Sequence, residues 1–362
     1  MEATLHRASL HYGAGLVLHT ASSGSVGYLD ALYLRLVKDG KAGVGEARIN
    51  IAYLNGLGAA QVLDDARSAL AQIDWALGAQ ALLDDSANWR KHYSAPVRMM
   101  IDSALHDLRA QELGVSVTGL FNADAARMQT WRSNQTLFWS SDETMLERAA
   151  GYLARGFHEL KLRVGIGAFE DDLRRIDLLR ERFGQRVTLS IDANGQWLSA
   201  DCPARFDALA RRAIEYVEQP IAAGDWTTLR ELAQTSPLTL MFDESLQSPA
   251  DIDALIELSG LPVAAHLKLV KLGGVMATIA AARKLTAAGI ALMIGQMNEG
   301  AAATAAALHV CMATAPRWAE LYGADGLLDD PASGLSYEAG SLRVAGRTGL
   351  GIAFDASRTQ PL

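Results

Sequence analysis

The sequence lacks the features that mark disulfide-linked, membrane-spanning and nucleic-acid-binding proteins. Its two cysteines, Cys202 and Cys311, lie far apart without a metal-binding spacing, which disfavours a disulfide framework and a structural zinc site. The longest apolar runs are alanine-rich and interrupted, as in residues 301–310, and they fall short of a membrane span. A formal net charge of −8 without a basic tract disfavours nucleic acid as a partner.

Signals for export and for nucleotide binding are also missing. The first residues, MEATLHRASLHYG, have no charged start followed by an apolar run, so we expect no secretion signal and a soluble, cytoplasmic protein. No P-loop or complete GxGxxG fingerprint occurs; the glycines at 165–167 lack the rest of the motif. With half of its 362 residues hydrophobic and a fifth charged, the chain has the composition of one large or two ordinary globular domains.

The first part of the chain mixes strand and helix signals. Alternating residues 30–37, the turn KDGKAG and residues 44–49 predict a hairpin, and residues 59–76 and 95–113 show helical periodicity. We therefore predict an α+β domain over residues 1–125.

From about residue 128 a repeat begins in which β-rich runs alternate with amphipathic helical stretches. Eight such strands predict a parallel (β/α) barrel over residues 126–325, and a doubly wound sheet is the alternative, although its nucleotide fingerprint is missing. A tail over residues 326–362, strand-like at 341–344, is expected to return to the N-terminal domain. The predicted strands are 130–139, 159–164, 188–194, 216–220, 238–244, 264–272, 291–297 and 318–323.

Three acidic residues stand at the ends of three consecutive predicted strands. Asp192, Glu218 and Asp243, in SIDANG, YVEQP and LMFDES, are 26 and 25 residues apart, which is one βα unit each time. One such acid is more often a helix cap or a solvated loop residue, but three in register favour convergence at the carboxyl ends of the strands. Clustered carboxylates need a cation, and Mg²⁺, or Mn²⁺ in its place, suits an all-oxygen site.

Cationic side chains face this acidic edge from other predicted strands. Lys161 and Arg163, in ELKLRVGIG, share one strand face and need anions there. Lys268, in AHLKLVKLGG, has the parity of His266 and is expected to face the barrel interior, whereas Lys271 has the opposite parity and is expected to face a helix or a loop. Lys268 either forms a structural ion pair or, with its pKa lowered by a divalent ion and other cations, removes a proton α to a metal-bound carboxylate.

These motifs resemble the enolase superfamily, specifically its muconate-lactonizing, or muconate cycloisomerase, subgroup. The similarity rests on KLR at 161–163, IDANGQW at 191–197, YVEQP at 216–220, FDES at 242–245 and LKLVKLGG at 267–274, and it spans essentially the whole chain. The resemblance implies a (β/α)7β TIM-like barrel under an α+β capping domain, in a homo-oligomer. It implies Mg²⁺ held by Asp192, Glu218 and Asp243, not Glu244, and an enediolate formed from a small carboxylate by Lys268, with Lys161 as electrostatic stabiliser.

The sequence departs from the family pattern at Arg163, where the pattern KxK has a second lysine. Arginine stays protonated and is a poor base, but it can bind a carboxylate or stabilise an enediolate. We therefore expect Lys268 to be the main acid–base residue, and a cycloisomerase-like isomerase is the reaction type that fits best. The alternatives are an acid-sugar or hydroxy-acid dehydratase (lyase), for which Gln296 and Asn298 could bind hydroxyls, then a racemase or epimerase, then a metal-binding protein without turnover.

Four residues are expected to contact the substrate: Asn194, Asn298, Glu320 and Tyr28. Glu320-Leu321-Tyr322 stands where dipeptide epimerases of the subgroup carry Asp-x-Asp for the substrate ammonium, which disfavours a simple dipeptide. Residues 20–29, TASSGSVGYL, are expected to form a lid over the pocket, with Tyr28 at the substrate, although a plain surface loop is the alternative.

Overall fold

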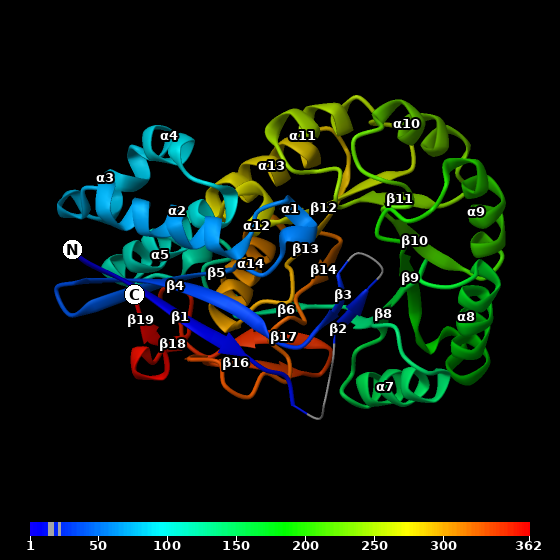
Figure 1. Ribbon diagram of the computed structural model, residues 1–362, viewed down its shortest axis with the longest axis horizontal. Helices are drawn as coiled ribbons and strands as arrows, with labels where there is room; N and C mark the ends of the chain where they lie inside the picture. Colours follow the sequence, from blue (N-terminus) through cyan, green and yellow to red (C-terminus); the bar gives the residue numbers. More distant parts are fainter. Residues whose placement is uncertain (14–17, 21–22) are drawn as a thin grey trace.

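A ring of parallel strands occupies the larger part of the molecule (Figure 1). The computed structural model describes residues 1–13, 18–20 and 23–362. Each neighbouring pair in this eight-stranded sheet is parallel, and a hydrogen bond of 2.9 Å from Asn134 N to Ala319 O joins its two ends. The strands are β7 (Gln135–Leu137), β8 (Glu159–Arg163), β9 (Thr188–Asp192), β10 (Ile214–Glu218), β11 (Thr239–Phe242), β12 (Val263–Lys268), β13 (Ala291–Gly295) and β14 (Trp318–Glu320).

Helices follow the barrel strands and form its outer layer (Figure 1). Together with the strands they confirm the predicted (β/α)7β barrel. Their apolar faces pack on the sheet, as at Ile176 and Leu179 of α8, because burying one face of each element is what stabilises such layers. The helices are α7 (Asp142–Ala154), α8 (Phe169–Phe183), α9 (Cys202–Ala210), α10 (Trp226–Thr235), α11 (Pro249–Ile256), α12 (Leu269–Leu272), α13 (Val275–Ala287) and α14 (Ala301–Thr314).

Two strand predictions were wrong in their extent. Residues 130–139 form two strands, because Asn134 closes the barrel and Ser133 Oγ accepts a hydrogen bond from Leu321 N at 2.9 Å; β6 (Thr130–Arg132) belongs to a different sheet. Residues 264–272 are a strand only to Lys268 and then turn into α12, which ends at Gly273 with a positive φ of 87°. The second error matters for the site, because side-chain parity cannot be counted past Lys268.

The N-terminal part forms an antiparallel sheet covered by helices. The sheet order is β19–β1–β4–β5, so the C-terminal β19 pairs with β1. The predicted helix over Ala95–Leu113 is confirmed as α5, whereas α2 ends earlier than predicted, at Gln72. The elements are β1 (Glu2–Leu10), β2 (Leu18–Thr20), β3 (Gly24–Val26), β4 (Leu29–Lys38), β5 (Lys41–Arg48), α1 (Ala52–Asn55), α2 (Ala59–Gln72), α3 (Ala79–Asp84), α4 (Ser86–Trp89), α5 and α6 (Val117–Phe121).

The C-terminal segment contacts both parts of the molecule. β17 pairs with β6 and β16, and β15 pairs with β18. We propose residues 1–125, 126–325 and 326–362 as the capping domain, the barrel and the returning segment. The remaining strands are β15 (Ala332–Ser333), β16 (Leu335–Glu338), β17 (Ser341–Val344), β18 (Ala353–Phe354) and β19 (Gln360–Pro361). No helix in the described part of the chain combines the length and the apolar character that crossing a membrane requires.

Because β5 packs closely on α5, we predict that position 45 tolerates only glycine. A Cβ atom there would lie 1.8 Å from Met100 O and 2.8 Å from Ala104 N, both backbone atoms of α5. We expect Gly45→Ala to lower the free energy of unfolding by about 3 kcal/mol, since the helix must shift to admit the methyl group. The matched control is Gly151→Ala on α7, where a Cβ meets nothing within 4 Å and the change is expected to stabilise the helix. Urea unfolding measures both, and equal stability of the two variants contradicts this packing.

A buried histidine at the contact of α14 with α6 predicts pH-dependent stability. His309 is buried, and its Nδ1 accepts a hydrogen bond of 3.2 Å from Thr118 N. Burial lowers the pKa of His309 to about 4. As the pH falls below about 6.5, His309 becomes protonated in the unfolded chain but stays neutral in the folded chain. The free energy of unfolding therefore falls as the pH falls below about 6.5.

The measurement compares wild type with His309→Gln, because other buried groups also titrate. We expect the stability of wild type relative to the variant to fall by about 2 kcal/mol between pH 7.5 and pH 5, at about 1.4 kcal/mol per unit below pH 6.5. The nearby Asp107, whose pKa burial raises to about 7, acts in the opposite direction and cancels in the difference. A difference that does not change with pH contradicts a neutral His309.

Candidate active site

Three buried carboxylates lie at the carboxyl ends of neighbouring strands. Asp192 ends β9, Glu218 ends β10, and Asp243 directly follows β11. Asp192 and Glu218 are direct neighbours in the sheet register, and Arg163 at the end of β8 is the partner of Asp192 on the other side. The local fold explains the cluster, because parallel strands of matched length present their last residues at one edge.

Lys161 and Arg163 supply the cations on one side of the cluster. Lys161 Nζ lies 2.8 Å from Glu218 Oε2 and 3.6 Å from Asp192 Oδ2, and it also pairs with Glu320. Arg163 forms an ion pair with Asp192 through Nη1. Burial alone would lower the pKa of Lys161, but the carboxylates of Glu218 and Glu320 raise it, so Lys161 is held as a cation.

Two lysines hold Asp243 from the other side. Lys268 Nζ lies 2.5 Å from Asp243 Oδ2, and Lys271 Nζ lies 2.5 Å from Oδ1 and donates to the backbone oxygens of Asp243 and His266. The expectation that Lys271 faces a helix or loop was wrong, because α12 turns it back toward Asp243. Burial alone would raise the pKa of the Asp243 carboxyl, but Lys268 and Lys271 hold it well below its usual range.

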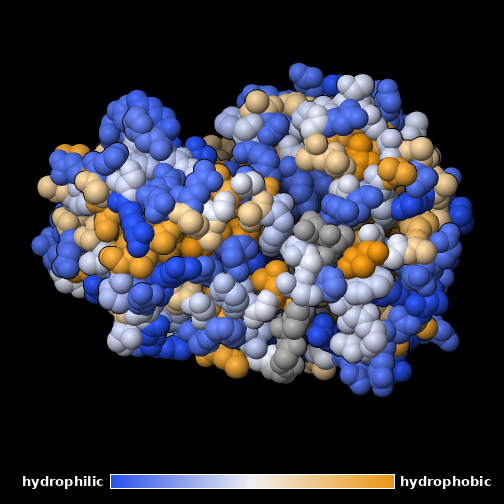
Figure 2. Space-filling view, in the orientation of Figure 1, coloured by the Kyte–Doolittle hydropathy of each residue, from blue (hydrophilic) through white to orange (hydrophobic). Residues whose placement is uncertain are grey.

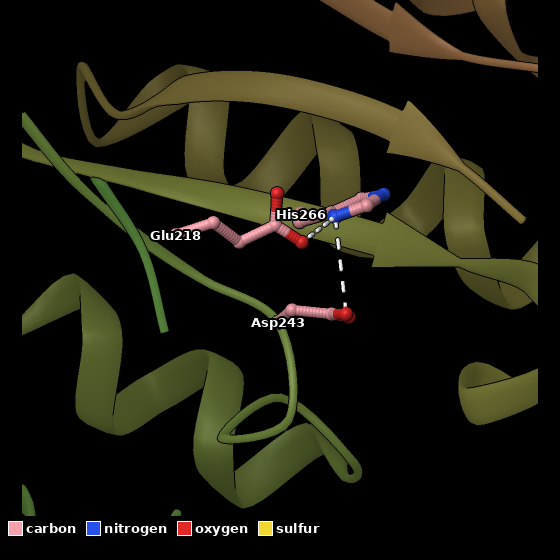
Figure 3. A group of neighbouring side chains, drawn as sticks. All are labelled: Glu218, Asp243 and His266. Atoms are coloured by element: carbon pink, nitrogen blue, oxygen red, sulfur yellow. Dashed lines mark hydrogen bonds and ion pairs between the residues drawn. The ribbon is translucent and has the colours of Figure 1, made fainter. Parts of the chain in front are cut away.

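His266 joins two of the carboxylates, a role that the sequence analysis missed. Its Nδ1 lies 2.8 Å from Glu218 Oε1 and 4.0 Å from Asp243 Oδ2 (Figure 3). Its ring needs Gly295 on the neighbouring strand, where a Cβ would come within 1.9 Å of Nε2. The shared parity with Lys268 was the available signal, because it places His266 on the inner face of β12.

The donor set fits a hard divalent cation. Ligand atoms of Glu218, Asp243 and His266 all lie within 4.8 Å of one another, and this group could hold a metal ion. The predicted ligand Asp192 is not one of these three residues, but Lys161 Nζ forms ion pairs with both Asp192 and Glu218. Two acceptor oxygens beside the cluster, Asn194 Oδ1 and Glu244 Oε2, are buried without a hydrogen-bond partner. Carboxylate and amide oxygens are the ligands that Mg²⁺ prefers.

The loops after the strands are held by side-chain contacts rather than by regular structure. Gln219, with a positive φ of 34°, accepts hydrogen bonds from the backbone N–H groups of Asp243 at 3.1 Å and Ser245 at 3.2 Å. Asn194, with φ of 46°, donates to Asp192 Oδ2 at 3.3 Å and to Glu244 Oε1 at 3.2 Å. These contacts fix the carboxylates relative to one another, so the cluster is preorganised.

A cavity of about 460 Å³ opens over the cluster. Of the four cations around the carboxylates, Lys268 and Arg163 line it, whereas Lys161 and Lys271 do not. The residues that line the cavity from the capping domain are mainly apolar, namely Leu18, Val26, Tyr53 and Leu54, whereas those from the barrel are mainly polar, with Phe138 and Met297 as large apolar exceptions. A substrate in this cavity meets one titratable lysine and one permanent cation.

Of the four residues expected at the substrate, Asn194 and Asn298 line the cavity. Asn298 Nδ2 donates to Tyr12 Oη at 2.8 Å, which anchors it to the capping domain. Glu320 is instead buried and paired with Lys161. Tyr28 is 45% exposed and stacks on His11, away from the cavity lining.

Part of the predicted lid lines the cavity, although Tyr28 does not. Ser23 and Val26, within residues 20–29, are lining residues, while Ala21 and Ser22 lie outside the described residues. Gln296, a candidate for binding hydroxyls, instead donates to Thr304 Oγ1 at 2.9 Å and does not line the cavity.

Without a bound cation, the neighbouring carboxylates favour the protonated form of Lys268. Burial lowers its pKa, but the carboxylates of Asp243, Glu218 and Glu320 outweigh burial and raise the pKa above its ordinary value. The positive charge of Lys161 lowers the pKa of Lys268, but by less than the carboxylates raise it. The expected lowering of this pKa therefore requires a bound divalent cation that neutralises the carboxylates.

The chain was compared with known families, sequences and structures. A family model described as "Enolase C-terminal domain-like" matches residues 144–358. An L-Lys-D/L-Arg epimerase of Methylococcus capsulatus is 35% identical over 71% of this chain and 72% of the relative. A chloromuconate cycloisomerase of Pseudomonas putida is 32% identical over 74% and 72%. The crystal structure of a dipeptide epimerase of Enterococcus faecalis complexed with Mg and L-Leu-L-Tyr superposes with a TM-score of 0.88 and 25% identity, over 97% of this chain and 99% of that one.

Proposed function

The chain belongs to the enolase superfamily, among its mandelate racemase and muconate lactonizing enzyme-like members, and from this premise we propose an isomerase that works from one lysine. In this proposal Lys268 removes or returns a proton α to the carboxylate of a small substrate, and the enediolate rearranges in a cycloisomerase-like reaction. The enzyme acts as a cytoplasmic homo-oligomer in the same proposal.

One observation carries this proposal: among the described residues, Lys268 and Arg163 are the two cationic groups that line the cavity. A lysine can alternate between its neutral and protonated forms, so Lys268 can serve as both acid and base. Arginine cannot lose its proton near neutral pH, so Arg163 binds and polarises but transfers no proton. The pair therefore favours proton transfer at one face of the substrate.

Asp192, Glu218 and Asp243 would hold Mg²⁺, with Mn²⁺ as a substitute, and His266 and Asn194 would support them. When bound, the ion neutralises charge that develops on the substrate carboxylate and thereby acidifies the α-proton. Lys161 adds a fixed positive charge beside Glu218 and Asp192. Mg is present in the E. faecalis epimerase structure, which supports the same ion here.

The apolar capping wall and the engaged Glu320 favour a substrate without a free α-ammonium group. Among the described residues lining the cavity, the carboxylates are Asp243 and Glu244, both at the proposed metal site. An ammonium group at the distal end would therefore lose water without meeting an acid. A carboxylate with an acyl-capped amine, or with no amine, suits this cavity better.

An epimerase or racemase is the second candidate, because the M. capsulatus relative is an epimerase. It requires a second proton-transferring group in the place of Arg163. The dehydratase alternative is weaker, since Gln296 is engaged by Thr304. Binding without turnover remains the outcome of a negative experiment.

The test is α-deuterium incorporation in D₂O with Mg²⁺, followed by NMR over a panel of carboxylates. The panel contains matched pairs in which the α-amine is free or acylated, together with unsaturated diacids. We expect Mg²⁺-dependent incorporation that retains configuration and favours the acylated member. Deuterium incorporation with inversion of configuration would establish an epimerase or racemase. No incorporation with any member of the panel would establish binding without turnover.

A further inference from the structure

A second cavity lies where the capping domain meets the barrel, outside the active site. It has a volume of about 550 Å³, compared with about 460 Å³ for the active-site cavity, and Gln247 is the one described residue that lines both. Its walls come from the segment after α4, from α5, and from α11 to α13. In Figure 2 the surface is notched between the part that carries α4 and the part that carries α11 and α13. We call this cavity the junction groove.

The charge of the junction groove is unbalanced. Arg90, Arg98 and Lys284 line it, while none of the acidic residues that the structure describes does. Arg90 pairs with Asp102 at 3.3 Å, and Lys284 pairs with Asp253. The side chain of Arg98 has no hydrogen bond or ion pair to any described residue, and its Nε is buried without an acceptor. A half-buried cation whose Nε is shielded from water and lacks an acceptor favours the binding of an anion.

The position of Arg98 is fixed by packing. A Cβ on Gly273 would come within 2.8 Å of Arg98 Nε and 3.1 Å of Arg90 Nη2, so both guanidinium groups lie against the backbone at the end of α12. Arg90 also donates to Leu272 O at 3.4 Å. Burial and the charge of Arg90 lower the pKa of Arg98 and outweigh the opposing influence of Asp65, so the positive charge of Arg98 is incompletely balanced. The groove therefore presents two adjacent guanidinium groups in a set geometry.

The floor of the junction groove is apolar. Ala277, Ala280 and Ala281 of α13 line it at helical spacing, and Ile252 of α11 and Leu272 of α12 complete the floor. An inorganic anion would leave this surface in contact with water. A ligand with a charged head and an aliphatic body would cover both the cations and the alanine face.

We propose that the junction groove binds an aliphatic monocarboxylate, with the carboxylate on Arg98 and Arg90 and the chain along α13. Bidentate pairing suits the planar guanidinium, and small alanine side chains leave room for an alkyl chain. The site is distinct from the active site, because the carboxylate-binding groups of the two cavities do not overlap.

Calorimetric titration of the full chain with octanoate tests this proposal. We expect saturable one-to-one binding that weakens at least tenfold in Arg98→Met and for the neutral probe octanamide. Binding is expected to persist in Lys268→Met, whose change lies in the other cavity. Since Arg98→Met removes packing on Gly273, Ala281→Phe, which fills the groove from its partly buried helix face, is expected to abolish binding independently.

Three results would overturn the proposal. One is no saturation up to about 10 mM octanoate, a limit far above a useful affinity. Another is binding lost in Lys268→Met, which would place the probe in the active site. The last is a change of oligomeric state in Ala281→Phe by light scattering, which would assign the groove to a contact between two copies of the chain.

Discussion

Replacing Lys268 with methionine is expected to lower kcat for the preferred carboxylate by about 10²- to 10⁴-fold, the usual contribution of a general acid–base group. Methionine keeps the length and the apolar stem of the side chain but can neither take nor return a proton. α-Deuterium incorporation is expected to fall in parallel, because Lys268 is the cavity-lining residue that we assign to proton exchange with the substrate. Stopped-flow turnover and NMR exchange are the two measurements.

Lys268→Arg separates the proton-transfer role from the charge. Arginine preserves the positive charge beside Asp243 Oδ2 but stays protonated, so this variant is also expected to lose turnover. Lys284→Met, on the exposed face of α13, serves as a matched lysine control that should keep full activity. Turnover retained in Lys268→Arg would show that the residue acts only by its charge, and exchange retained in Lys268→Met would remove it from the mechanism.

The barrel and its acidic edge were predictable because they depend on regular elements. Strand–helix alternation fixes which residues stand at the carboxyl end of each strand; Asp192 and Glu218 are the last residues of theirs, and Asp243 directly follows its strand. Lys161 and Arg163 were also predictable as neighbours on one face, since β8 is a short regular strand. The side-chain periodicity of a helix or strand predicts which residues share a face only within that element.

The contacts that the sequence did not reveal lie where regular structure ends. Lys271 reaches Asp243 only because α12 begins at Leu269, and no spacing rule extends across that change from strand to helix. Glu320 was placed at the end of β14, but its partner Lys161 comes from a strand far away in the sequence. Tyr28 was predicted from its place in a loop, and loop side chains follow local packing, here on His11.

Changing Arg163 to lysine is expected to add proton exchange at the second face of the substrate. β8 and β12 are separated by three strands in the eight-stranded sheet, so Arg163 and Lys268 approach the cavity from opposite sides of the barrel. A lysine at position 163 keeps the positive charge next to Asp192 and acquires a transferable proton. We expect α-deuterium incorporation with inversion to rise by at least about 10²-fold over wild type, within the range of general acid–base catalysis.

Arg163→Met gives the matched control, because it removes both the charge and the hydrogen bonds. It should bind substrate weakly and show no inversion, whereas Arg163→Lys should invert configuration with little change in KM. If both variants lose activity equally, the guanidinium itself is required, and the planar two-point contact that only arginine offers becomes its function. If wild type already inverts its substrate, proton transfer at the second face comes from another group and the one-lysine mechanism fails. The stereochemical outcome, more than the rate, therefore decides what Arg163 does at this site.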